Sequence, residues 1–123
     1  MVITTTKTGK GIFNKTRKSI VIGNYKACKG VLSQAKGLMF TRRRQRGLIF
    51  IFNKENNVSL HMFFVFYPID VLFLSSDKKV VEIKENFRPF TFYFPRRKSR
   101  FVIELPEGTI KKSKTSVGDT ISF

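Results

Sequence analysis

Four side chains of this chain could take part in acid–base, nucleophilic or metal chemistry, namely Cys28, His61, Asp70 and Glu104. Hydrolysis by a Ser-His-Asp or Cys-His arrangement needs a base, and His61 is the only histidine, with Asp70 in the same hairpin region. The pair would meet if the strands on either side of Pro68 folded back on each other. A single histidine in an aromatic strand is more often a structural residue. We therefore assign no residue to catalysis and keep His61, Asp70 and Glu104 as candidates.

Asp70 and Glu104 each interrupt an apolar strand. A carboxylate in such a place must face solvent, pair with a cation or accept backbone N–H bonds, because burying it without a partner is costly. Either acid could line a pocket, but the pattern favours structural acids that hold a loop or an arginine. No spacing of acids with Cys28 and His61 completes a tetrahedral ligand set, so we predict no metal site, and no cofactor.

The chain is strongly basic, with a net charge of +16, and the charge is unevenly placed. Residues 1–54 hold thirteen Lys or Arg and no acid, whereas residues 55–123 hold eleven basic and eight acidic residues. Such asymmetry is typical of proteins that bind polyanions, and it is also compatible with a solvated surface. The sequence therefore leaves two interpretations of the basic first half, a surface that binds a polyanion and a solvated surface.

Two arginine-rich turns are the candidate anion-binding sites. They contain Arg42, Arg43, Arg44 and Arg46 in the first turn and Arg96, Arg97 and Arg100 in the second. The second turn lies in the segment 87–101, where aromatic and basic residues alternate as in a stacking surface for single-stranded nucleic acid. The alternation of Phe90, Phe92 and Phe94 favours a different interpretation, a core strand with these rings on its buried face, followed by a basic turn.

The stretch 61–83 is predicted to form the middle of the fold. It reads as a strand, a corner at Pro68, a second strand, a polar turn and a third strand. Between Met62 and Leu74 only Pro68 and Asp70 break the apolar run, so this region must be covered on both faces.

Further strands are predicted around 12–13, 19–23, 47–52, 90–94, 101–105 and 120–123, and one short helix from Val31 to Met39. Lys111, Lys112 and Lys114 are placed in a polar link. The fold class is mostly all-β, a small barrel or bent sandwich of about eight short antiparallel strands with one short helix. We expect residues 1–11 to be a flexible end, or at most an edge strand, and residues 12–123 to form a single β domain.

Cys28 is the only cysteine, so no intrachain disulfide can form. The first residues lack an apolar signal core, and no run approaches the length of a membrane span. A cytoplasmic location is the expectation, with the oligomeric state left open.

Five blocks of this chain resemble, in order and spacing, a known family. They are Gly37-Leu-Met-Phe40, Gly47-Leu-Ile-Phe-Ile-Phe52, the stretch 61–74, Phe101-Val-Ile-Glu-Leu-Pro-Glu-Gly-Thr109 and Val117-Gly-Asp119. The chain is similar over residues 19–123 to the domain of unknown function 192. This resemblance implies a compact β-rich domain and no established activity. Many members carry Trp-Met-Lys-Asn where this chain has His61-Met-Phe-Phe64, which makes this rim more apolar. Many also begin with an export signal, and this chain does not.

Two functions remain open. The first is a non-enzymatic binding module for an anionic partner, RNA more than duplex DNA because no recognition helix is evident. The second is a small-molecule-binding or hydrolytic domain with a pocket near His61, Asp70 and Glu104. The two differ in their dependence on salt, since binding of a polyanion weakens steeply with ionic strength.

Overall fold

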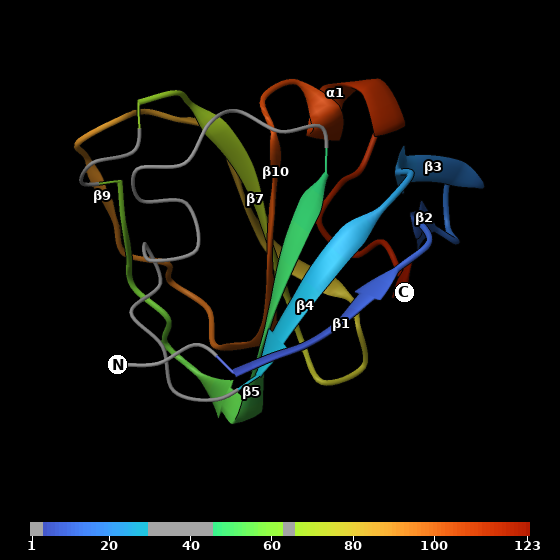
Figure 1. The fold of residues 1–123 in the computed structure, drawn as a ribbon, viewed down its shortest axis with the longest axis horizontal. Helices are drawn as coiled ribbons and strands as arrows, with labels where there is room; N and C mark the ends of the chain where they lie inside the picture. The colour runs from blue at the N-terminus through green and yellow to red at the C-terminus, as the bar shows by residue number, and fades with distance from the viewer. Residues whose placement is uncertain (1–3, 30–45, 63–65) are drawn as a thin grey trace.

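The computed structural model describes residues 4–29, 46–62 and 66–123, which form three β-sheets and one short α-helix (Figure 1). The large sheet has six strands in the order β1-β4-β5-β10-β7-β8. They are β1 (Thr4–Gly9), β4 (Tyr25–Lys29), β5 (Gly47–Asn56), β7 (Ile69–Leu74), β8 (Val80–Phe87) and β10 (Ser99–Pro106). The second sheet, in the order β11-β2-β3, contains β2 (Ile12–Asn14), β3 (Ser19–Ile22) and β11 (Ile121–Ser122). The third joins β6 (Leu60–His61) to β9 (Phe92–Tyr93), and α1 is Thr109–Ser113.

The predicted fold class, mostly β and mostly antiparallel, is confirmed. Within the described residues, each strand pair is antiparallel except β4 with β5. Parallel neighbours need a crossover connection, and residues 30–46 between these two strands are long enough to supply one. Each sheet runs from one edge strand to another without closing, so the bent-sandwich form fits better than a barrel. Residues 4–9 form the edge strand β1, which is the second of the two alternatives expected for this segment.

The central strands of the large sheet are buried on both faces, as the apolar run around Pro68 predicted. All six residues of β7 are buried, and β10 lies between β5 and β7. On β10, Val102 packs in one core cluster, whereas Ile103 packs in the other. Successive residues of a strand point to opposite faces, so a strand buried on both sides must be apolar almost throughout.

Different segments cover the two faces of the large sheet. One face packs against Leu60 of β6 and half-buried Tyr93 of β9, and we call it the β9 side. The other packs against Ile12 of β2, Ile110 of α1 and Ile121 of β11, and we call it the α1 side. In Figure 1, β9 lies to the left of the large sheet, and β2 and β3 lie to its right.

The helix α1 begins where the sequence analysis placed a polar link, so that assignment was wrong for Lys111 and Lys112. Gly108 precedes the helix with a φ of 88°, a left-handed conformation that glycine adopts without a steric penalty. The helix is only five residues long, too short to be stable by itself, so its contacts with the sheets maintain it. The helix predicted from Val31 to Met39 lies outside the described residues.

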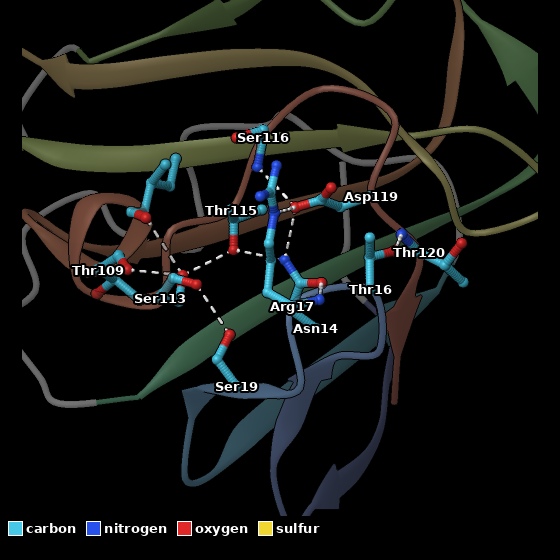
Figure 2. A network of polar contacts seen from close by, with 11 residues as sticks. Asn14, Thr16, Arg17, Ser19, Thr109, Ser113, Thr115, Ser116, Asp119 and Thr120 are labelled. Atoms are coloured by element: carbon cyan, nitrogen blue, oxygen red, sulfur yellow. Dashed lines mark hydrogen bonds and ion pairs between the residues drawn. The ribbon is translucent and has the colours of Figure 1, made fainter.

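A polar network joins the β2-β3 hairpin to residues 109–120 near the end of the chain (Figure 2). The Asp119 Oδ2 atom accepts hydrogen bonds from Asn14 Nδ2 at 2.9 Å, the Ser116 amide at 2.9 Å and Arg17 Nε at 3.1 Å. Asn14 Nδ2 also donates to Thr115 Oγ1 at 3.1 Å. Burial raises the pKa of Asp119, but these hydrogen bonds and the charge of Arg17 outweigh burial and lower it overall.

Ser113 extends this network to α1 and β3. Its hydroxyl lies 2.7 Å from Thr115 Oγ1, and its carbonyl accepts a hydrogen bond of 2.8 Å from Ser19 Oγ. The network therefore holds the β2-β3 hairpin against the last turn of the chain.

We expect Asp119→Ala to lower the free energy of unfolding by about 1–3 kcal/mol, because three donors lose their acceptor. Since the folded-state pKa of Asp119 is below its ordinary value of 3.8, its contribution is present above that pH and is lost as the pH falls through the folded-state pKa. Urea denaturation near neutral pH measures the effect. Asp77→Ala, at an exposed acid in the β7–β8 turn, is the control. Equal midpoints for the two variants would contradict the prediction.

Candidate functional site

Asp70 is a structural acid. Its Oδ1 accepts a hydrogen bond from the Asn86 amide, and its Oδ2 accepts bonds from the Gly108 and Ile110 amides, each at 3.0 Å. The last two donors belong to the first turn of α1, whose N–H groups have no partner within the helix. Asp70 therefore caps α1 and holds it to β7 while it also fixes the end of β8.

Glu104 lies in the middle of the large sheet and faces the β9 side. It pairs with Leu48 of β5 and Val71 of β7, and its exposed fraction is 5%. Its Oε1 has no hydrogen-bond partner among the described residues. Burial raises the pKa of Glu104 from 4.5 to about 8, so this carboxyl group is mostly protonated at neutral pH.

The structure does not bring the candidate catalytic residues together. Asp70 and Leu105 are register partners on β7 and β10, and Glu104 is the next residue along β10, so the two acids point to opposite faces of the sheet. The backbone of His61 pairs with Phe92 in the β6-β9 sheet, on the β9 side. Cys28 is buried, and burial raises the pKa of its thiol, which disfavours the nucleophilic thiolate.

Phe90, Phe92 and Phe94 are exposed, so the prediction of a core strand with these rings buried was wrong. Their exposed fractions are 49%, 54% and 69%, and that of Phe66 is 64%. The rings of Phe92 and Phe94 are stacked, with centroids 6.0 Å apart and planes inclined by 11°. Phe66 and Phe90 meet edge to face with centroids 5.5 Å apart. Four large apolar rings therefore lie at the surface in two touching pairs.

The inward-facing ring of β9 is that of Tyr93 rather than Phe92, and it is half-buried. Its ring centroid lies 5.8 Å from that of Phe73 and 6.1 Å from that of Phe87, both in the core of the β9 side. Its hydroxyl donates a hydrogen bond of 2.5 Å to Glu82 Oε2. Burial, together with this bond and the charge of Glu82, raises the pKa of Tyr93 to about 12. One inward ring thus anchors a strand whose neighbouring rings face outward.

Basic residues flank three of the exposed rings, Phe90, Phe92 and Phe94, in the sequence. Arg88, Arg96, Arg97 and Lys98 are exposed, and residues 87–100 contain no acid. Arg100 uses one of its guanidinium donors within the fold, because its Nε donates a hydrogen bond to the Phe52 carbonyl at 3.1 Å. We name the set Phe66, Phe90, Phe92, Phe94, Arg88, Arg96, Arg97 and Lys98 the aromatic–basic surface. It is the candidate functional site.

Of the four arginines predicted in the first arginine-rich turn, the structure describes only Arg46. Arg46 is half-buried just before β5, and Arg42, Arg43 and Arg44 lie outside the described residues. Sequence reasoning missed Phe66 and Glu82. Phe66 was read as part of the buried run, and nothing in the spacing of Glu82 indicates that it meets Tyr93, which is eleven positions away.

The part of the chain that the structure describes shows neither a cluster of metal ligands nor a membrane-crossing helix. No group of three or more His, Cys, Asp or Glu residues is placed there to hold a metal ion. None of its helices is long and apolar enough to cross a membrane.

These features define an open, mostly antiparallel β protein with exposed aromatic and basic side chains at Phe66 and in the segment 88–98. The family model of the domain of unknown function 192, described as an uncharacterized ACR, matches residues 14–123. The chain belongs to this family, which confirms the resemblance seen in its five sequence blocks.

Archaeal relatives and bacterial structures agree with this assignment. A UPF0127 protein of Thermococcus sibiricus is 36% identical over 114 residues, which cover 91% of this chain and 73% of that protein. A UPF0127 protein of Pyrococcus horikoshii is 33% identical, with 91% and 97% covered. A crystal structure from Sinorhizobium meliloti, named provisionally as a transcription regulator, has a TM-score of 0.80 at 24% identity and covers 99% of this chain and 97% of that one. A protein of unknown function from Novosphingobium aromaticivorans has a TM-score of 0.76 at 22% identity, with 98% and 85% covered. At such identities the two structures establish the fold alone.

We expect Asp70→Ala to lower the free energy of unfolding by about 1–3 kcal/mol, because three backbone amides lose their acceptor and α1 loses its cap. Glu107→Ala is the matched control, since Glu107 is an exposed acid in the turn that Asp70 holds. Urea denaturation of both variants measures the difference. An unchanged midpoint for Asp70→Ala would mean that water satisfies these amides equally well.

Glu104 should make the protein less stable as the pH rises. The folded state keeps a proton on Glu104 up to about pH 8, whereas the unfolded chain releases it near its ordinary pKa of 4.5. The contribution of this proton is therefore complete below pH 4.5 and is lost between pH 4.5 and 8. The slope is at most about 1.4 kcal/mol per pH unit. The Cys28 thiol is a titratable group on which the charge of Glu104 acts.

Glu104→Gln should flatten this dependence, and the variant should be more stable than the wild type near pH 8. Urea midpoints measured from pH 5 to pH 9 provide the comparison. Glu85→Gln, at an exposed acid of β8, should leave the wild-type slope unchanged. A wild-type slope that persists in Glu104→Gln would assign the pH dependence to another group.

Proposed function

We propose that this protein is a non-enzymatic binding module that holds single-stranded RNA on its aromatic–basic surface. The observation that carries the proposal is the stacked pair of Phe92 and Phe94, exposed by 54% and 69%, beside a turn whose Arg96 and Arg97 side chains are also exposed. Stacking rings and phosphate-binding cations placed together are what a single strand requires.

The physical argument begins with the cost of exposing these rings. Contiguous apolar groups at a surface are unfavourable in water and usually mark a binding site. A nucleobase that stacks on such a ring contributes about 1–3 kcal/mol, and it does so for any base because each has a π-face. The neighbouring arginines add attraction for the phosphates, which is independent of base sequence and sensitive to salt.

A single strand fits better than a duplex. Reading the major groove requires a helix or a two-stranded ribbon inserted in it, and α1, the helix found in the described residues, has five residues. Bases of a duplex are stacked on each other, so exposed phenylalanines would find no free base face. Unpaired RNA presents its bases for stacking. Arg42, Arg43, Arg44 and Arg46 remain proposed as further phosphate contacts.

The alternative of a small-molecule or hydrolytic pocket has less support. The Asp70 carboxylate is engaged by three amides, and Glu104 faces the opposite side of the sheet. A pocket that uses both acids would need the central strands to change register.

The test measures binding of a fluorescently labelled oligouridylate at several salt concentrations. We expect F92A/F94A to weaken binding by about 10- to 100-fold with little change in salt dependence, because stacking is removed and charge is kept. We expect R96Q/R97Q to lower the slope of log K against log salt by about 0.7 for each phosphate that the variant no longer binds.

Two variants serve as controls. K111Q/K112Q removes the same charge from α1, which lies away from β9 in Figure 1, and Phe13→Ala removes an exposed ring from β2. Neither should change RNA affinity as much as the test variants. Absence of salt-dependent RNA binding by the wild type would overturn the proposal. The proposal would also be overturned if the wild type bound phosphatidylserine vesicles but not RNA, and if F92A/F94A abolished this binding to vesicles.

A further inference from the structure

Glu82 on β8 makes three hydrogen bonds to the segment that carries the aromatic–basic surface. Its Oε2 accepts the bond from the Tyr93 hydroxyl. Its Oε1 accepts bonds from the backbone amides of Arg96 and Arg97 at 2.8 and 2.9 Å. The donors lie on both sides of Pro95, so one carboxylate fixes the end of β9 and the basic turn together.

Before Tyr93 this segment has other attachments, because the Met62 amide donates to the Thr91 carbonyl at 2.8 Å and the Phe90 amide donates to the Met62 carbonyl at 2.6 Å. β9 has only two residues and pairs with the two-residue strand β6, and an isolated two-stranded pair is marginally stable in water. Pro95 has no amide to donate to a sheet. The Glu82 carboxylate therefore supplies acceptors that the strand pairing does not provide.

An acid at this place is unexpected if charge alone mattered, because a carboxylate repels a polyanion. Glu82 uses its lone pairs to accept bonds from two amides and a hydroxyl, and among the described residues no ion pair joins it to an arginine side chain. The guanidinium groups of Arg96 and Arg97 remain exposed. The carboxylate thus orders the backbone of the turn and leaves its cations available.

We infer that Glu82 is a positioning residue, which holds Phe92, Phe94, Arg96 and Arg97 in one fixed arrangement for a nucleotide strand. The inference rests on the proposed RNA binding. An ordered surface loses less conformational entropy on binding, so removing Glu82 should weaken the complex although the variant is more positively charged. If only charge mattered, removing Glu82 would strengthen RNA binding, whereas a positioning role predicts that removing Glu82 weakens it.

The experiment compares Glu82→Ala with Glu85→Ala in the oligouridylate assay. Both variants remove one acid from β8, and Glu85 is exposed. We expect Glu82→Ala to weaken binding by about tenfold, because the surface is less ordered before it binds. Glu85→Ala should leave binding unchanged or slightly stronger. Glu82→Gln keeps one carbonyl acceptor for the two amides, so it should restore part of the affinity.

A second readout needs no RNA. Amide hydrogen exchange at Arg96 and Arg97 should accelerate in Glu82→Ala, and Tyr93 should titrate at a lower pH than in the wild type, where its pKa is about 12. If Glu82→Ala does not fold, Glu82→Gln is compared with Glu85→Gln, and a smaller loss of RNA affinity in the same direction is expected because the glutamine keeps one carbonyl acceptor.

The outcomes separate the two proposals. Wild-type binding to RNA with equal or tighter binding by Glu82→Ala would overturn the positioning role and leave the proposed function in place. No wild-type binding would overturn the proposed function and, with it, the role of Glu82 toward RNA. Unchanged amide exchange at Arg96 and Arg97 would overturn the positioning role in either case.

Discussion

The pairing of β7 with β10 in the centre of a sheet buried on both faces is the constraint on which the rest of the structure depends. Every residue of β7 is buried, so the sheet needs a covering layer on each side. The β2-β3-β11 sheet with α1 supplies one layer, and β6 with β9 contributes to the other. These covering elements are short, and short elements need fixed attachment to the sheet.

Carboxylates provide that attachment. Three acids each accept three hydrogen bonds. Asp70 accepts them from the start of α1 and from β8, and Glu82 accepts them from β9 and the basic turn. Asp119 accepts them from the β2-β3 hairpin and the last turn of the chain. Acids are few in this chain, 8 against 24 basic residues. Three of them act as acceptors for structural donors, and most of the Lys and Arg side chains in the described part of the chain are exposed.

The aromatic–basic surface follows from this division. Tyr93 and Glu82 secure β9 from within, so the outward rings are not needed for the core. Exposed rings and cations held by a rigid attachment form a surface suited to a flexible, negatively charged chain with stacking groups. Glu104 differs from these three acids, because its Oε1 has no hydrogen-bond partner among the described residues and burial raises its pKa, so we expect it to make the stability of the sheet depend on pH.

The sequence by itself determined the fold class, the burial of the central strands and the structural role of Asp70. Those features depend on local apolar pattern and on the cost of burying a carboxylate, and both are visible in a single strand. Tertiary structure alone decided which face of 90–94 turns inward, because both faces of that strand carry aromatic rings and period-two alternation does not distinguish them. It also decided the position of α1, which depends on a cap from Asp70, 38 positions before Gly108. The contacts of Glu82 and the opposite orientations of Asp70 and Glu104 could not be predicted from the sequence either. They depend on the register between distant strands, which a local sequence pattern does not determine.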